Sequence, residues 1–294
     1  MIKHYLKVAF RNLIKYKTQS LVSIIGLAVG FTCFALSVLW IRYEMTYDNF
    51  HEGADRIYLV RAHYANEPGT SKFTPYPLMK YLQDKMPEIE AVTAFTAHYV
   101  KFRMEDTEQE IGMIAADSVF MNFFDIQLLK GTVNFLKCDG QEVAITKEFA
   151  KRLFSKEEDA LGKEVEVGRR VCKIGAIVSG WSNHSNIPYN ILAPARHSPQ
   201  WGSSNEQLLI RVRERTDIDA FRTKMSTVCI NDIEKESELS DLLITRMSAL
   251  RYSDYVDKAD VVISFSYIFY FSLAGGLVII CSVSYTHLTL PTIR

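Results

Sequence analysis

The sequence predicts an α+β domain, composed of two mixed α/β subdomains, that lies outside a membrane between two transmembrane α-helices. Three observations support this prediction. Two uncharged apolar runs of about twenty residues stand near the two ends of the chain. A basic segment precedes the first run, and strand and helix patterns alternate through the region between the runs.

Residues 1–20 predict a cytoplasmic amphipathic helix. Apolar residues recur at helical spacing from Ile2 to Ile14, and five basic residues with no acidic residue occupy the remaining arc and its end. Such a helix lies along a membrane surface with its cations near anionic lipid headgroups. We therefore expect Lys7, Arg11 and Lys15 to contact membrane lipid.

Residues 21–41 predict the first transmembrane helix. The run carries no charge, and at 1.5 Å per residue it is about 31 Å long, the thickness of a hydrocarbon core. The basic segment before it places the N-terminus in the cytoplasm. The alternatives are a buried helix of a soluble protein and a cleaved signal peptide. The bulky Leu39, Trp40 and Ile41 at the end of the run do not suit a cleavage site, so we expect a membrane anchor.

Residues 42–260 predict the external α/β domain, with a boundary between its subdomains near residues 134–140. Alternation and β-branched content predict strands at 56–65, 91–104, 142–146, 164–167, 171–178, 208–212 and 241–247. Helical spacing and capping residues predict helices at 75–86, 118–124, 147–154 and 218–236. Acidic residues outnumber basic ones in this region, which argues against a nucleic-acid partner.

Residues 261–283 predict a second transmembrane helix, in which Gly275 and Gly276 suit close helix packing. A helix that returns to the cytoplasm should be followed by basic residues, yet only Arg294 is charged after it. We therefore expect residues 284–294 to be an artefactual tail and the chain to be a fragment. The alternative is a genuine short tail.

Catalytic and metal-binding patterns are missing from the sequence. It contains no phosphate-binding loop, no G-x-S-x-G and no H-E-x-x-H motif, and its five cysteines form no C-x-x-C pair. His184 is expected to form hydrogen bonds within a loop rather than to bind a metal. The sequence does not decide whether two of Cys138, Cys172 and Cys229 form a disulfide. We therefore expect no catalytic residue, no cofactor site and no metal site, and do not expect an enzyme.

Several segments together resemble a known family. These are the opening residues 1–31, the segment YEMTYDNFHEGADRIYLVR at 43–61, residues 116–132, residues 143–154 with the following ALGKEVEVG, and the His184 loop. In this order and spacing they resemble FtsX-like permeases of ABC transporters, in particular the MacB-like type common in Bacteroidetes. The resemblance implies a domain like the MacB periplasmic core.

The resemblance also implies a function. The chain would be an N-terminal fragment of a permease subunit in the bacterial inner membrane, where it passes ATPase-driven motion to a periplasmic domain for export or extrusion. The full-length protein would have a separate ABC ATPase subunit, a second permease and membrane lipid as partners, whereas the fragment alone would not couple to the ATPase. The junction after the first span would then matter most, at Tyr47, Asp48, Phe50, His51, Asp55 and Arg56. A purely structural role is the alternative for Asp55 and Arg56, which could cap and anchor the first strand.

A two-span membrane sensor with a ligand-binding domain is the alternative function. Sensors and permeases share the same order of span, external domain and span, so hydropathy does not separate them. The sequence after the second span would do so, because a sensor continues into a signalling region and a permease into a basic loop and further spans.

Overall fold

A computed structural model describes residues 4, 11, 14–65, 69–104, 107–137, 141–232, 238–252, 272, 274–276 and 278. The chain forms two compact units. One comprises residues 1–46 with 263–294, and the other comprises Tyr47–Val262.

The first unit contains helix α2, Lys17–Glu44. Its part Ile24–Glu44 is long and apolar enough to cross a membrane, and most of its side chains are exposed in the isolated chain. The predicted span at 21–41 therefore lies within one continuous helix. Residues 272, 274–276 and 278 of the second apolar run are helical, whereas the rest of that run and the tail at 284–294 lie outside the described residues.

The amphipathic N-terminal helix is described only in part. Lys7 lies outside the described residues, while Arg11 and Lys15 are helical and exposed. Their contact with lipid stays a prediction.

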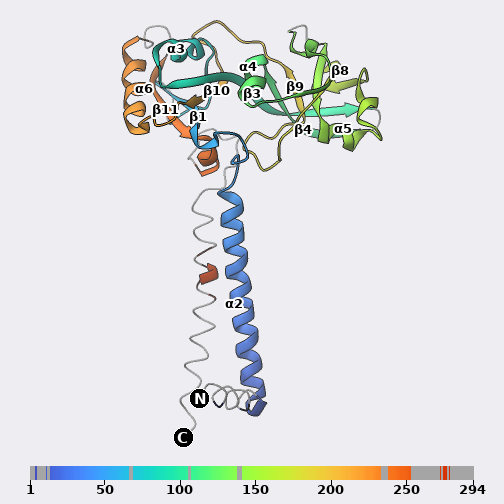
Figure 1. Cartoon of the computed structure of the whole chain (residues 1–294), viewed down its shortest axis with the longest axis vertical. Helices are drawn as coiled ribbons and strands as arrows, with labels where there is room; N and C mark the ends of the chain where they lie inside the picture. Colours follow the sequence, from blue (N-terminus) through green and yellow to red (C-terminus); the bar gives the residue numbers. More distant parts are fainter. Residues whose placement is uncertain are drawn as a thin grey trace. The chain divides into compact units, whose positions relative to one another are not determined.

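The second unit is organised around one eleven-stranded sheet, of which nine strands follow the order β11-β1-β10-β3-β4-β9-β6-β8-β5. The long strand β3, Ile89–Met104, belongs to both parts of this sheet (Figure 1). Its residues from Ile89 to Phe95 pair with β10, and those from Thr96 to Met104 pair with β4, Thr107–Ala116. One strand thus joins two sheet regions that carry different helices.

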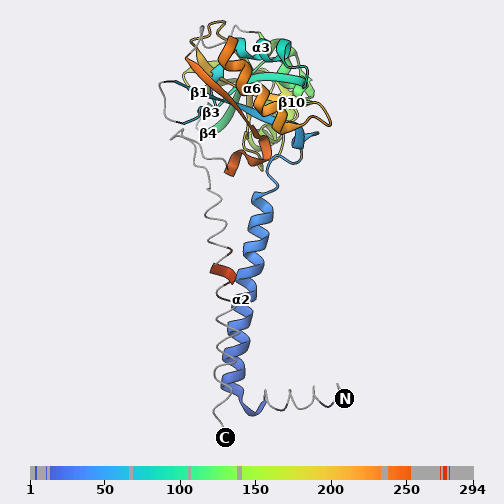
Figure 2. The same ribbon diagram turned by 90° about the vertical axis from the view of Figure 1, so that its left-hand side faces the viewer.

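The first region is antiparallel and contains β11 (Leu239–Arg246), β1 (Ile57–Tyr64), β10 (Ser204–Val212) and the start of β3, with β2 (Thr74–Pro75) beside β10. Helices α3 (Pro77–Lys85) and α6 (Ile218–Asp232) pack on one face of this region (Figure 1, Figure 2). Alternate residues of β1 point to opposite faces, and both faces are covered. This explains why the four residues from Ile57 to Val60 are all buried.

The second region contains β4, β9 (Ile191–Pro194), β6 (Glu142–Thr146), β8 (Arg170–Val178), β5 (Leu128–Gly131) and β7 (Glu164–Val167). The pairs β4–β9 and β6–β8 are parallel. Helix α5, Lys147–Leu153, packs Phe149 against Phe102 of β3 in a core of its own. Short 3-10 turns occupy Val133–Leu136 and Glu157–Ala160.

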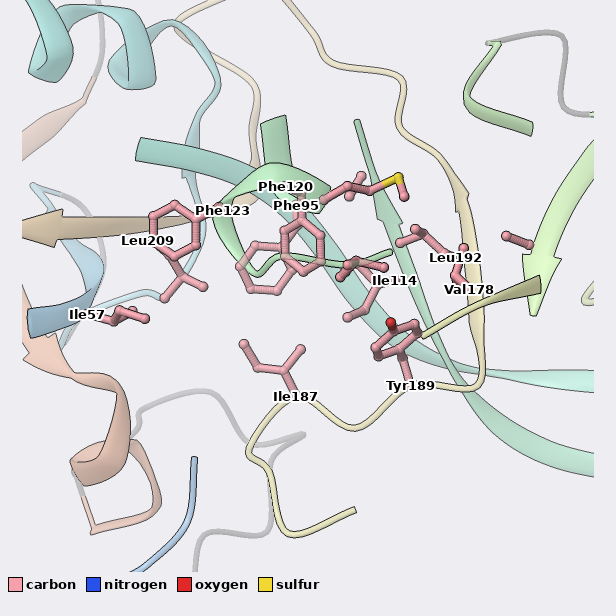
Figure 3. Packing of buried hydrophobic residues seen from close by; sticks show 14 of the residues in the cluster. Ile57, Phe95, Ile114, Phe120, Phe123, Val178, Ile187, Tyr189, Leu192 and Leu209 are labelled. Atoms are coloured by element: carbon pink, nitrogen blue, oxygen red, sulfur yellow. The ribbon is translucent and has the colours of Figure 1, made fainter. Parts of the chain in front are cut away.

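A third hydrophobic cluster lies where the two regions meet (Figure 3). Helix α4, Ser118–Phe123, begins at Asp117, whose carboxylate accepts hydrogen bonds from the backbone N–H groups of Val119 and Phe120. This cap directs Phe120 and Phe123 into the cluster. The 3-10 turn η4, Met247–Tyr252, lies near the C-terminal end of the domain in the sequence and adds Met247 to this cluster.

The predicted strands and helices of the domain are found close to their expected bounds. Strands β2, β4, β5 and β9 were not predicted, and Pro75, expected in the helix at 75–86, lies in β2. The predicted end of the last helix, at residues 233–236, lies outside the described residues. The subdomain boundary near 134–140 stays a prediction, and each region of the sheet takes strands from both sides of that segment.

Candidate functional site

The candidate site lies at Asp48, four residues after the end of α2. Asp48 is fully buried and has a backbone φ of 59°. Left-handed backbone is unfavourable for residues other than glycine, although aspartate and asparagine tolerate it best. A buried carboxylate on strained backbone indicates that its surroundings hold it in place.

Hydrogen bonds from a distant loop surround the Asp48 carboxylate. Oδ1 accepts a hydrogen bond from the Ser185 hydroxyl, and Oδ2 accepts one from the Asn186 backbone N–H at 3.0 Å and one from the Asn186 side-chain amide. The Asp48 backbone N–H in turn donates to the His184 carbonyl at 3.2 Å. Ser185 also accepts from the Ile187 N–H at 3.0 Å, which fixes the loop around the carboxylate.

Asn186 extends these contacts to a third segment. Its side-chain amide also donates to the Met247 carbonyl, at 3.2 Å, in the turn η4. Asp48, Ser185, Asn186 and the Met247 carbonyl form what we call the Asp48 cluster. It joins the segment after α2, the loop at 182–187, and the turn that precedes the second apolar run in the sequence.

The electrostatics of Asp48 reflect two opposed effects. Burial raises the pKa of its carboxyl above the ordinary value of 3.8, because removing the charge from water is costly. The hydrogen bonds from Ser185 and Asn186 act in the opposite direction, since they stabilise the charged form.

Aromatic side chains pack beside the Asp48 cluster. The Tyr47 ring lies 3.9 Å from the His184 ring, centre to centre. His51 lies 4.7 Å from Phe124 and 4.9 Å from Trp181, edge to face with the latter. The Trp181 indole N–H donates to the Ile187 carbonyl at 3.0 Å, so the loop and the aromatic group hold each other.

His51 is kept neutral by its surroundings. Burial lowers its pKa from 6.5 to about 4, and the positive charge of Arg211 acts in the same direction. The Arg211 guanidinium donates to the Phe123 carbonyl at 2.6 Å and lies over the Phe123 ring, so its charge has a fixed position. His51 therefore serves as an apolar ring at neutral pH.

The other predicted junction residues lie apart from the Asp48 cluster. Arg56 forms an ion pair with Glu90 at 2.6 Å and donates to the Val212 carbonyl at 3.1 Å, next to the start of β1. Asp55 is exposed in the 3-10 turn Ala54–Arg56, and Phe50 is exposed with its ring 4.2 Å from that of His51. These contacts are consistent with an anchoring role of Arg56 at the first strand, and its part in function stays a prediction.

The arrangement suits mechanical linkage. Its donors and acceptors pair with one another across three segments of the chain. Among the described residues, no group of three or more His, Cys, Asp or Glu side chains is placed to hold a metal ion. Cys172 is buried, and Cys138 lies outside the described residues.

A model of the MacB-like periplasmic core domain family matches residues 20–228, which is more than half of the chain. The chain belongs to this family. The prediction of a MacB-like ABC transporter permease is thereby confirmed, and the unit Tyr47–Val262 is the MacB-like periplasmic domain. No curated protein matches the sequence.

Three solved structures are similar to this MacB-like domain. A domain of a protein assigned as a permease, from Porphyromonas gingivalis, is 20% identical with a TM-score of 0.53, and the match covers 67% of this chain and 92% of that one. The extracellular domain of the noncanonic ABC-type transporter YknZ from Gram-positive bacteria is 14% identical, with a TM-score of 0.47 over 64% and 99%. The periplasmic region of MacB from Actinobacillus actinomycetemcomitans is 13% identical, with a TM-score of 0.48 over 68% and 93%. The first likeness confirms the mixed α/β fold.

Proposed function

We propose that this chain belongs to the permease subunit of an ABC transporter and that the subunit transmits ATPase-driven motion to its periplasmic domain for export or extrusion. In this proposal the N-terminus is cytoplasmic and α2 crosses the inner membrane. A separate ABC ATPase binds and hydrolyses ATP, a second permease completes the assembly, and the chain itself is not an enzyme.

The Asp48 cluster is the observation that carries the proposal. It connects the segment that follows α2 to the turn η4, which leads in the sequence to the second apolar run. Hydrogen bonds to a charged group contribute about 1.5–3 kcal/mol each. A displacement of the segment after α2 is therefore passed to the loop at 182–187 and to η4 together.

The domain behind the cluster is suited to receive such a displacement as one body. The loop at 182–187 continues into Ile187 and Tyr189, which lie in the central hydrophobic cluster (Figure 3). Met247 of η4 lies in the same cluster. Close-packed interiors transmit displacement with little compression.

The test starts from the tagged full-length permease subunit that contains this chain, purified from membranes of its source bacterium, with co-purification of an ABC ATPase as the first expected result. Spin labels at the exposed positions Leu39 of α2 and Tyr99 of β3, introduced as L39C and Y99C after removal of the native cysteines, then report the distance between the two units. We expect this distance to change when a non-hydrolysable ATP analogue is added.

Two variants separate the parts of the proposal. Asp48→Ala should reduce the change in distance while ATP hydrolysis continues, and Asp55→Ala, at an exposed acid of the same segment, should leave both unchanged. The absence of any nucleotide-dependent change in the unaltered protein would refute the permease function. An unchanged response in Asp48→Ala would refute the role of the Asp48 cluster alone.

A further inference from the structure

Gly275, in the second apolar run, closely approaches helix α2 within the first unit. Gly275 is buried. A β-carbon added at Gly275 would lie 2.9 Å from Ser37 Oγ and 3.5 Å from the Cys33 carbonyl oxygen. A β-carbon essentially never lies under 3.0 Å from another atom, so a larger residue fits here only if the Ser37 hydroxyl turns away or the two helices move apart.

The facing side of α2 carries small residues. Spacings of four, three and four residues place four of them on one stripe of the helix: Gly26, Gly30, Cys33 and Ser37. Gly30 and Ser37 are buried and the other two are half-buried, whereas the neighbouring Phe31, Leu36 and Val38 are exposed. The stripe is therefore covered while the rest of the helix surface at this level is open.

The Ser37 hydroxyl also donates to the Cys33 carbonyl of its own helix at 2.8 Å. In hydrocarbon, where there is no hydrophobic force between helices, small residues let two backbones approach closely and gain dispersion energy.

We propose that the second apolar run crosses the membrane packed along this stripe of α2, with Gly275 fixed against Ser37, so that the two runs form one helix pair. The occupant of the stripe is thus a segment of the same chain. Gly276 provides an internal comparison, because a β-carbon added there meets no atom within 4 Å. An added β-carbon therefore meets α2 at Gly275 but not at Gly276.

Disulfide cross-linking in membrane vesicles tests the proposal on the full chain, with the five native cysteines replaced by alanine. A disulfide with an S–S bond of about 2.05 Å places each β-carbon about 3 Å from the opposite sulfur. The 2.9 Å from the Gly275 β-carbon position to Ser37 Oγ meets this requirement. Under mild oxidation, S37C with G275C should therefore form a disulfide within one chain, identified by mass spectrometry of its tryptic peptides.

Two control pairs keep one cysteine of the contact and move the other to the adjacent residue. These pairs are S37C with G276C and V38C with G275C. They should cross-link at least about tenfold more slowly, because an added β-carbon at Gly276 meets no atom within 4 Å and Val38 is exposed beside the stripe. Equal rates for all three pairs, or no disulfide in any pair, would overturn the proposal.

A second measurement does not depend on cysteine chemistry. In the otherwise unaltered chain in detergent, Gly275→Leu should lower the midpoint of thermal unfolding of the helix pair, and Gly276→Leu should leave it unchanged. If the two leucine variants behave alike, the fixed contact at Gly275 is wrong. Neither measurement uses ATP, so a failure here leaves the proposed transport function standing, and the reverse also holds.

Discussion

The lowered pKa of His51 predicts that acid destabilises the periplasmic domain. Its folded-state pKa is about 4, compared with 6.5 for the free side chain. The folded state therefore resists protonation, so the stability that neutral His51 provides is complete above pH 6.5 and is lost as the pH falls toward 4. At 1.36 kcal/mol per pKa unit, the whole loss is about 3 kcal/mol.

The measurement compares unaltered protein with His51→Phe by urea unfolding between pH 7 and pH 4. Phenylalanine keeps a ring against Phe124 and Trp181 but does not titrate. We expect the free energy of unfolding of the variant to fall less with acid, by about 3 kcal/mol over this range. The free energies of unfolding of the two proteins must be subtracted, because Asp48 is present in both and changes their stability with pH in the direction opposite to His51. Its raised pKa means that its stability contribution is present at low pH and is lost as the pH rises.

His98→Phe is the matched control, because His98 is exposed on β3. It should follow the pH profile of the unaltered protein. If the difference between His51→Phe and the unaltered protein is constant from pH 7 to pH 4, the burial and charge argument for His51 is refuted.

Three further substitutions test other parts of the structure by urea unfolding at neutral pH. Asp48→Ala should destabilise the domain by about 3 kcal/mol, because it leaves buried donors of the loop unpaired. Asp48→Gly should cost about 1 kcal/mol less, because glycine accepts a φ of 59°. Equal losses for the two variants would show that backbone strain is absent. Arg56→Ala should cost less than Asp48→Ala, since its ion pair is partly exposed, and a larger loss would contradict its peripheral role. Gly112→Ala should cost about 2 kcal/mol, because its β-carbon would lie 2.4 Å from the Pro188 carbonyl oxygen. Gly202→Ala should be neutral, because its β-carbon would have no atom within 4 Å. Similar effects of the two substitutions would show that the loop containing Pro188 moves aside freely.

Local pattern was sufficient to predict most elements of the fold. Strand β6 and strand β7 occupy the predicted residues, because each combines β-branched residues with turn signals at its ends. Strand β4 was missed because its sequence, TEQEIGMIAA, has few residues that favour strands. It is a strand because it pairs along the whole second half of β3. Strand β9 is four residues long and is defined by its non-local neighbours β4 and β6.

The sequence predicted the candidate site only at the segment after α2 and not at the loop that binds it. The family resemblance indicated Asp48, but its partners Ser185 and Asn186 follow more than 130 residues later, and no local signal connects them to it. In this loop the sequence indicated only His184, whose carbonyl accepts a hydrogen bond from the Asp48 backbone N–H. The following Ser185 and Asn186 provide the side chains that bind the Asp48 carboxylate. A contact of this range depends on the tertiary fold, so a single sequence does not reveal it.

The position of β1 in the sheet constrains the biosynthesis of the domain. β1 is the first strand to be made, yet it lies between β10 and β11, which are the last two. At translation rates of about 5–20 residues per second, roughly ten seconds or more separate β1 from β11. For most of this interval, until β10 is made, the apolar residues Ile57 to Val60, which end up buried on both faces, have neither partner strand. The nascent domain therefore needs protection until nearly all of it has been made, and a chain that stops before β10 leaves β1 exposed to aggregation or proteolysis.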